Sequence, residues 1–221
     1  MEFDFSPFFI EYEAVAATAD KTFDSVKTKY LDLVNCKIKC TDCCYALFDV
    51  SLIEAVYINR HFNETIEEKA RQTICEKANK IDRTIYKIKR NAYKQLKAGK
   101  DENAILTDMA KEKVPCPLLN DRQECDLYLF RPITCRLYGI PAAIGGAGRT
   151  CGKSGFKKGE SYQTVYLDVL FKKLYEISAR MIERIDSKYD KIAEILMPLS
   201  MAVITDFNEE FFGIKNLSVD S

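Results

Sequence analysis

The chain has 221 residues, 47% of them hydrophobic, and its 33 Lys and Arg residues balance its 33 Asp and Glu residues, so the formal net charge is zero. A hydrophobic fraction of this size is typical of a globular protein with a buried core. The charge balance provides no general attraction to polyanions, which argues against nucleic acid as the main partner.

No apolar run approaches the roughly 20 residues that a membrane span requires. The N-terminus, Met1-Glu2-Phe3-Asp4, is acidic and lacks the basic region of a signal peptide. We therefore expect a cytoplasmic protein with no membrane partner. In a reducing compartment, nine cysteines indicate metal or redox chemistry and not a framework of disulfides.

Helical periodicity dominates the first hundred residues. Apolar residues recur at steps of three and four over residues 8–34, which predicts a first helix that leads directly to Cys36. A second helix is expected to end near Phe62. Ser51 and Glu54 have the spacing of a capping box at its start, and Asp49 is the competing N-cap.

The strongest helical pattern covers residues 64–98 and ends at Gly99, a common C-terminal stop. A short helix over residues 101–113 follows, with Asp101 as its N-cap. The polar face of the long helix includes several cations, which we interpret as a solvated face because acidic residues occur on the same helix. These cations are Lys87, Lys89, Arg90 and Lys94.

Residues 114–158 contain most of the glycine and proline, which predicts an irregular region with at most a few short strands around residues 116–126. Residues 145–150 are interpreted as a flexible turn that brings Cys151 to the other cysteines. A second long helix is expected over 159–197, and a last amphipathic piece over 199–212.

The expected fold is therefore mainly α. We predict a helical bundle with an irregular, loop-rich cysteine region and few or no strands, in a single domain that covers residues 1–221. The cysteine region would cover residues 36–151, and the helices over 64–98 and 159–197 would form its scaffold.

Eight of the nine cysteines fall into two sets that indicate a metal site. Short spacers let one loop wrap a metal at small entropic cost, and thiolates select zinc or iron–sulfur clusters. Both kinds of site need four ligands, so the two sets are expected to meet in space. The first set is Cys36, Cys40, Cys43 and Cys44, and the second is Cys116, Cys125, Cys135 and Cys151.

The adjacent pair Cys43 and Cys44 complicates the assignment of ligands. Adjacent side chains diverge in most backbone conformations, so the simplest solution assigns the two thiols to different centres. Two four-thiolate sites and one site with additional cysteines both remain open. Cys75 lies on the long helix and is interpreted as structural. His61, the only histidine, is interpreted as an ordinary residue near a helix end and not as a ligand.

The full motif comprises Cys36-x3-Cys40-x2-Cys43-Cys44, Cys116-Pro117-Leu118-Leu119, Cys125-Asp126-Leu127-Tyr128 and Arg131-Pro132-Ile133-Thr134-Cys135-Arg136-Leu137-Tyr138. Over residues 36–151 it resembles the YkgJ-type cysteine-cluster family, described as zinc- or iron-chelating. The resemblance implies a metal or iron–sulfur site formed by these cysteines and does not imply a particular reaction.

The arginines and tyrosines of the same motif are expected near the metal. A multi-thiolate site is negatively charged, so arginine donors would offset its charge and hydrogen-bond to sulfur. We expect Arg131, Arg136 and Tyr138 to contact the cofactor, together with Tyr128 in the same motif. The alternative is that they cap helices or form local ion pairs.

The function expected from the sequence is that of a metal-binding protein. A 4Fe–4S cluster is preferred over zinc, with a role in electron transfer or metal handling and with a protein or redox partner. The Cys36-x3-Cys40-x2-Cys43 spacing also occurs in radical S-adenosylmethionine enzymes, whose strand-rich α/β barrel does not fit the long helices expected here.

Two other functions are weaker alternatives. Flagellin lysine methylases resemble this chain in their cysteine motif, so a protein lysine methylase that uses a cluster and S-adenosylmethionine is the alternative function. A zinc module that binds nucleic acid is disfavoured by the zero net charge.

Overall fold

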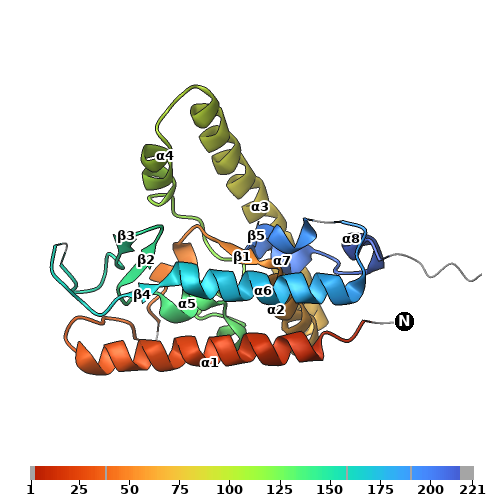
Figure 1. Ribbon diagram of the computed structural model, residues 1–221, viewed down its shortest axis with the longest axis horizontal. Coiled ribbons are helices and arrows are strands. Elements are labelled where there is room, and N and C mark those ends of the chain that lie inside the picture. Colours follow the sequence, from red (N-terminus) through yellow and green to blue (C-terminus); the bar gives the residue numbers. More distant parts are fainter. Residues whose placement is uncertain (1–2, 38, 158, 190, 215–221) are drawn as a thin grey trace, which may run out of the picture.

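The computed structural model describes residues 3–37, 39–157, 159–189 and 191–214 (Figure 1). The protein is mainly helical with a few short strands, as the sequence predicts, whereas the narrower expectation of a bundle stays a prediction. The α-helices in the described residues are α1 (Ser6–Lys29), α2 (Leu52–Thr65), α3 (Glu68–Lys97), α4 (Glu102–Met109), α5 (Ile133–Leu137), α6 (Leu167–Ile185), α7 (Leu199–Ile204) and α8 (Glu209–Phe212).

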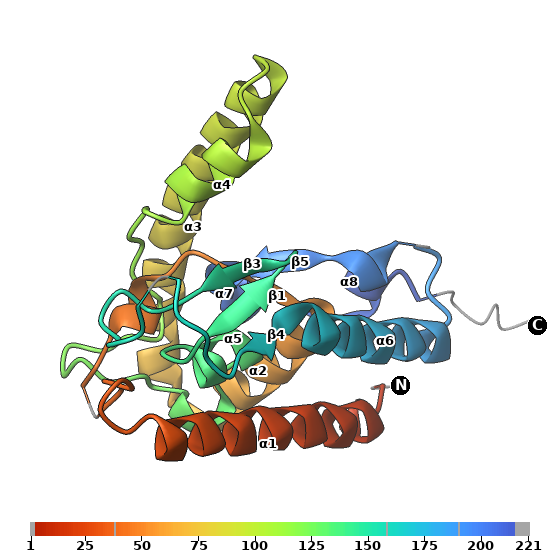
Figure 2. The ribbon, with the colours of Figure 1, turned by 60° about the vertical axis from the view of Figure 1, so that its left-hand side comes forward.

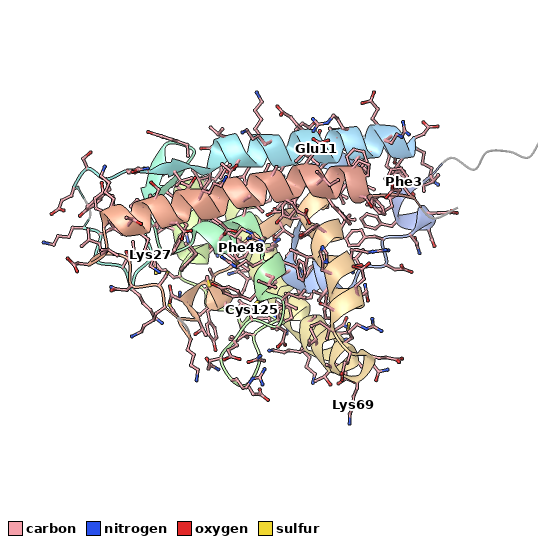
Figure 3. The ribbon with its side chains drawn as sticks, turned by 90° about the horizontal axis from the view of Figure 1, so that it is seen from below. Phe3, Glu11, Lys27, Phe48, Lys69 and Cys125 are labelled. Atoms are coloured by element: carbon pink, nitrogen blue, oxygen red, sulfur yellow. The ribbon has the colours of Figure 1, made fainter. Side chains whose placement is uncertain are left out.

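Helices α1 and α6 lie side by side and enclose one core cluster with α2 and α5 (Figures 1 and 3). Their apolar residues recur at helical spacing, so each helix buries one stripe. Tyr12 of α1 and Met181 of α6 are completely buried in this cluster. Ser178 of α6 also accepts a hydrogen bond from the Ile53 amide in the first turn of α2, 3.1 Å away. One otherwise unpaired helix-end donor is thereby satisfied.

Helix α2 begins with the predicted capping interaction. The Glu54 carboxylate accepts hydrogen bonds from the amide and the hydroxyl of Ser51, both 3.0 Å long. Its other oxygen accepts the amide of Ile133, the first residue of α5, at 2.9 Å. One buried carboxylate therefore joins the start of α2 to the start of the helix that carries Cys135.

A second core cluster lies between α2, α3 and α7. Ile74 and Ala78 of α3 pack there with Ile58 of α2 and Val203 of α7. Farther along its length, α3 extends beyond the rest of the molecule, and α4 folds back along it (Figures 1 and 2). The Asp101 side chain caps α4 as predicted, accepting the Ala104 amide at 2.9 Å.

The strands form two small sheets. In the first, β1 (Asp49–Ser51) pairs antiparallel with β5 (Leu196–Pro198), so that Asp49 faces Pro198. The second has the order β3-β2-β4, with β2 (Ala142–Ile144), β3 (Ala147–Arg149) and β4 (Val165–Tyr166). The described residues contain no helix long and apolar enough to cross a membrane.

The long helix predicted over residues 159–197 is wrong in extent, because α6 ends at Ile185. Asp186 adopts a left-handed conformation with φ of 53°, which stops the helix. The apolar pattern continues beyond this point because Ile192 and Met197 still face the core, the first from a 3₁₀ turn and the second from a strand.

Several other predicted boundaries also differ. The turn expected over residues 145–150 is confined to Gly145 and Gly146, both with positive φ, which connect β2 to β3 in a hairpin. Near residues 116–126 the described chain has one isolated bridge, from Leu119 to Cys125. Helix α1 ends at Lys29, α3 begins at Glu68, α4 ends at Met109, and residues 199–212 form two short helices.

Candidate metal centre

Five cysteines line one cavity of about 50 Å³, and we call them the inner group. They come from four separate parts of the sequence. Phe48 and Cys125, which both line the cavity, are labelled in Figure 3. The inner group is Cys43 and Cys44 of the 3₁₀ turn η1 (Asp42–Tyr45), Cys116 and Cys125 of the irregular region, and Cys135 of α5.

Backbone hydrogen bonds hold the two cysteine segments together. The Cys116 amide donates to the Cys44 carbonyl at 2.6 Å, and the Val114 amide donates to the Tyr45 carbonyl at 3.2 Å. These bonds continue into an antiparallel bridge between Ala46 and Lys113. The two predicted cysteine sets therefore meet through main-chain pairing.

Cys43 and Cys44 point into the same cavity, with their sulfur atoms 4.0 Å apart. The expectation that these adjacent side chains diverge is therefore wrong. The short side chains turn toward each other from the tight η1 turn. Four thiolates around a tetrahedral zinc, at zinc–sulfur distances of about 2.3 Å, lie about 3.8 Å from one another. The observed separation of the pair is close to that value.

Mutual repulsion and burial govern the ionisation of the inner thiols. The pKa of Cys43 is lowered because the Cys135 and Cys44 thiols donate hydrogen bonds to its sulfur. The pKa of Cys116 rises to about 12 and that of Cys125 to about 11, chiefly through burial. The cavity thus stabilises one thiolate and resists further ones unless a cation neutralises them.

The remaining three cysteines of the two predicted sets, Cys36, Cys40 and Cys151, form the outer group. The Cys36 thiol donates to the Tyr138 carbonyl at 3.5 Å, and the Cys151 thiol donates to the Asp42 carboxylate, also at 3.5 Å. The pKa of Cys36 is raised to about 11. Burial is the largest cause, and the nearby thiols of Cys40, Cys151 and Cys43 raise it further. The outer thiols therefore influence one another and adjoin the inner group through Cys43.

Asp42 lies between the two groups and was not identified from the sequence. Its carboxylate accepts a hydrogen bond from the Tyr138 hydroxyl at 2.9 Å. The amino groups of Lys113 and Lys153 lie 3.9 and 3.8 Å from its other oxygen. Its position directly before the Cys43-Cys44 pair is the only sequence signal that could have indicated this role.

Gly139 is a second residue that the sequence reasoning missed. It has a φ of +105°, and a Cβ atom at this position would lie 2.2 Å from the Cys36 sulfur. Only glycine fits this conformation next to Cys36. A glycine directly after the Arg131–Tyr138 motif was the available signal.

The arginines of the motif have other partners than sulfur. Arg136 donates to the Asp20 carboxylate at 2.5 Å and to the carbonyls of Arg131 and Leu129. Arg131 also bonds Asp20, at 3.3 Å, and its guanidinium lies over the Tyr128 ring. These contacts are the local ion pairs of the alternative interpretation. Arg131 additionally lines the cavity, so its role toward a cofactor stays a prediction.

His61 and Cys75 lie outside the two groups. The His61 imidazole stacks on Phe130, with ring centroids 3.8 Å apart, and burial lowers its pKa. Cys75 packs against the second core cluster and does not line the cavity. Both arrangements agree with the structural interpretation of these residues.

The inner group offers only sulfur donors to a metal. Within the described ranges, no three His, Cys, Asp or Glu side chains already have the geometry of a metal site. Five soft thiols around an apolar cavity are nevertheless the ligand chemistry that zinc and iron–sulfur clusters require. The inner group therefore fits a thiolate-bound metal in donor chemistry.

One buried hydroxyl lies in the neighbouring core. No described residue accepts a hydrogen bond from the Tyr12 hydroxyl, and its burial is the chief reason that its pKa is raised.

Comparisons of this chain with protein-family models, with curated proteins and with solved structures found no match.

Proposed function

We propose that this protein binds a metal centre through the inner group, with a 4Fe–4S cluster preferred and zinc as the alternative metal. The observation that carries the proposal is the convergence of five cysteines from four parts of the sequence on one cavity. Residues up to 92 positions apart in the chain, from Cys43 to Cys135, contribute to it. Plain packing of cysteines as small hydrophobes does not require such a convergence.

The cavity favours a cluster over a single ion. Its volume of about 50 Å³ exceeds the ~10–15 Å³ that one water-sized sphere occupies. Its walls include Leu118, Leu127 and Phe130, and low solvent exposure is one of the factors that set the potential of an iron–sulfur cluster. A cluster in this place suits electron transfer or metal handling with a protein partner.

The direct test is metal analysis of the protein purified without oxygen. We expect iron and sulfide in equal amounts, with the visible absorption of a cluster. Stoichiometric zinc without sulfide would overturn the iron–sulfur assignment and retain the metal role. Failure to bind either metal after anaerobic reconstitution would overturn the metal role itself.

Single cysteine variants test the ligand assignment. Cys43→Ser and Cys135→Ser are expected to lower metal content strongly, because both sulfurs lie at the cavity. Cys75→Ser is the matched control and is expected to retain full metal content. Cys36→Ser and Cys151→Ser show whether the outer group serves the same centre: an unchanged sulfide content in both would restrict the cluster to the inner group.

A further inference from the structure

A row of six cations follows the exposed side of α3, and we call it the basic row. At 100° per residue the six side chains fall within an arc of about 100°, opposite the buried Ile81 and Ile85. All six are exposed. The basic row consists of Lys80, Arg83, Lys87, Arg90, Lys94 and Lys97.

From Arg83 onward the basic row has no acidic residue on its own helix, although Lys87 shares a groove with Asp108 of α4 and with Glu112. None of the six forms an ion pair with a residue that the structure describes, whereas Lys89 of the same helix pairs with Asp49 at 2.6 Å. An ordinary solvated helix face carries both signs in i, i+4 pairs, and this pattern is absent over the described distal half of α3.

Two exposed tyrosines border the basic row. The exposed fraction is 62% for Tyr86 and 59% for Tyr93, and the Lys97 amino group lies 5.5 Å from the centroid of the Tyr93 ring. Tyrosine and arginine are enriched among the residues that carry most of the binding energy at protein interfaces. An aromatic ring left in water beside unpaired cations is therefore a feature of an interaction surface.

The position of the basic row makes it accessible. The distal part of α3 stands away from the body together with α4 (Figures 1 and 2). On the opposite side of α3, Ile81 and Ile85 line the cysteine cavity. A partner on the proximal part of the row would therefore lie about one helix diameter, 10–12 Å, from the wall of the inner group.

The spacing of the cations indicates the kind of partner. The steps of three, four, three, four and three residues average 3.4, so the row runs nearly parallel to the axis for about 25 Å. A second helix with carboxylates at the same spacing can match these cations along its whole length. A nucleic acid strand lacks this helical repeat, and the zero net charge of the chain weakens its long-range attraction.

We propose that the basic row of α3 is a docking surface for an acidic amphipathic helix of a partner protein. This inference goes beyond the metal-binding proposal and does not depend on it, because none of the six cations is a candidate ligand. A partner held there would be placed beside the cysteine cavity.

Two synthetic helical peptides of about 25 residues test the proposal. In the first, glutamates form one stripe at steps of three and four. The second has the same composition with the glutamates distributed around the helix. By fluorescence anisotropy at low salt we expect the striped peptide to bind the full chain at least about tenfold more tightly than its isomer.

Matched protein variants locate the surface. The arm variant combines Arg83→Gln, Lys87→Gln, Arg90→Gln and Lys94→Gln, and the control variant combines Lys21→Gln, Lys69→Gln, Lys172→Gln and Lys173→Gln. All eight side chains are exposed, and both variants remove four charges. We expect the arm variant to lose at least about tenfold in affinity and the control less than about twofold, with unchanged circular dichroism.

Three outcomes overturn the proposal. Equal affinity for the two peptides would show that the spacing of the glutamates does not matter. Equal losses of affinity in the arm and control variants would show that binding does not occur at α3. Tighter binding of a single-stranded oligonucleotide than of the striped peptide, lost only in the arm variant, assigns the basic row to nucleic acid.

Discussion

The inner and outer cysteine groups adjoin each other and differ in what surrounds their sulfur atoms. Inner sulfurs face one another and apolar residues such as Leu118 and Phe130. In the outer group, Cys36 donates to a carbonyl and Cys151 to Asp42, which also faces two lysines, although Cys36 packs against the first core cluster as well. Two of the three outer thiols thus have oxygen acceptors, whereas the inner thiols adjoin other thiols and apolar side chains.

Different contacts also hold the two groups in place. The inner group depends on main-chain pairing and on the buried Glu54 behind α5. The outer group depends on side-chain contacts of Asp42 and on the absence of a side chain at Gly139. Substitutions at these supporting residues therefore separate the two groups without touching any cysteine.

Gly139→Ala is expected to have the largest effect and to act on the outer group. The new methyl group would meet the Cys36 sulfur in a backbone conformation with positive φ, which should destabilise the fold by about 2–4 kcal/mol. Thermal unfolding measures the loss. Gly99→Ala is the control, since it also has positive φ but no atom within 4 Å. An equal loss in both would show that Cys36 is not tightly placed.

Glu54→Gln tests the support of the inner group. The Ser51 and Ile133 amides donate to different oxygens of Glu54, and glutamine has only one oxygen, so we expect a loss of about 1–3 kcal/mol in chemical denaturation near pH 5. Burial raises the pKa of Glu54, so the folded state retains its proton at a pH where the unfolded state loses it.

This proton linkage gives Glu54→Gln a pH signature. The stability that the Glu54 carboxyl group contributes to the wild type is fully present below the ordinary carboxyl pKa. It decreases as the pH rises through the raised pKa of Glu54 in the folded state. Glutamine does not titrate, so the stability gap between wild type and variant should narrow with rising pH. A gap that widens with pH would contradict the raised pKa.

Asp42→Asn is expected to have a smaller effect, confined to the outer group. It weakens the acceptor for the Tyr138 hydroxyl and the Cys151 thiol, which should cost about 1–2 kcal/mol. Tyr138→Phe removes one of these donors and should cost no more than Asp42→Asn. Metal content of the inner group should be unchanged in both variants, and its loss would show that the two groups act as one site.

Tyr12→Phe has the smallest expected effect. No described residue accepts a hydrogen bond from this buried hydroxyl, so its removal should raise stability by up to about 1 kcal/mol in thermal unfolding. Tyr57→Phe is the control, because its hydroxyl bonds Glu13 at 3.0 Å and its removal should destabilise the protein. A loss of stability in Tyr12→Phe as large as that in Tyr57→Phe would show that the Tyr12 hydroxyl has a partner.

The local features of the fold could be predicted from the sequence. The capping interaction of Ser51 and Glu54, the cap at Asp101 and the apolar stripe of α3 all depend on residues a few positions apart. Side-chain chemistry and helical spacing determine such features nearly independently of the rest of the chain. Spacing also predicted that the distant cysteine sets meet.

The features that could not be predicted from the sequence depend on contacts between distant segments. The pairing of Asp49 with Pro198 joins residues about 150 positions apart, and nothing in either segment specifies it alone. Arg136 was expected near the cofactor, which stays a prediction, and nothing in its local sequence indicated its bond to Asp20 of α1. The shared direction of Cys43 and Cys44 follows from how η1 packs, which the adjacency of two cysteines does not reveal.

The β1–β5 pairing also sets an order of events when the chain is synthesised. Pro198, Leu199 and Ser200 form part of the cavity wall, and they follow Cys135, the last inner cysteine in the sequence, by 63 or more residues. Contacts of such high sequence separation form late because a long loop must close first. We therefore expect that nascent chains leave the five inner cysteines exposed until residues 198–200 have been synthesised, and that the inner cavity closes only after that point.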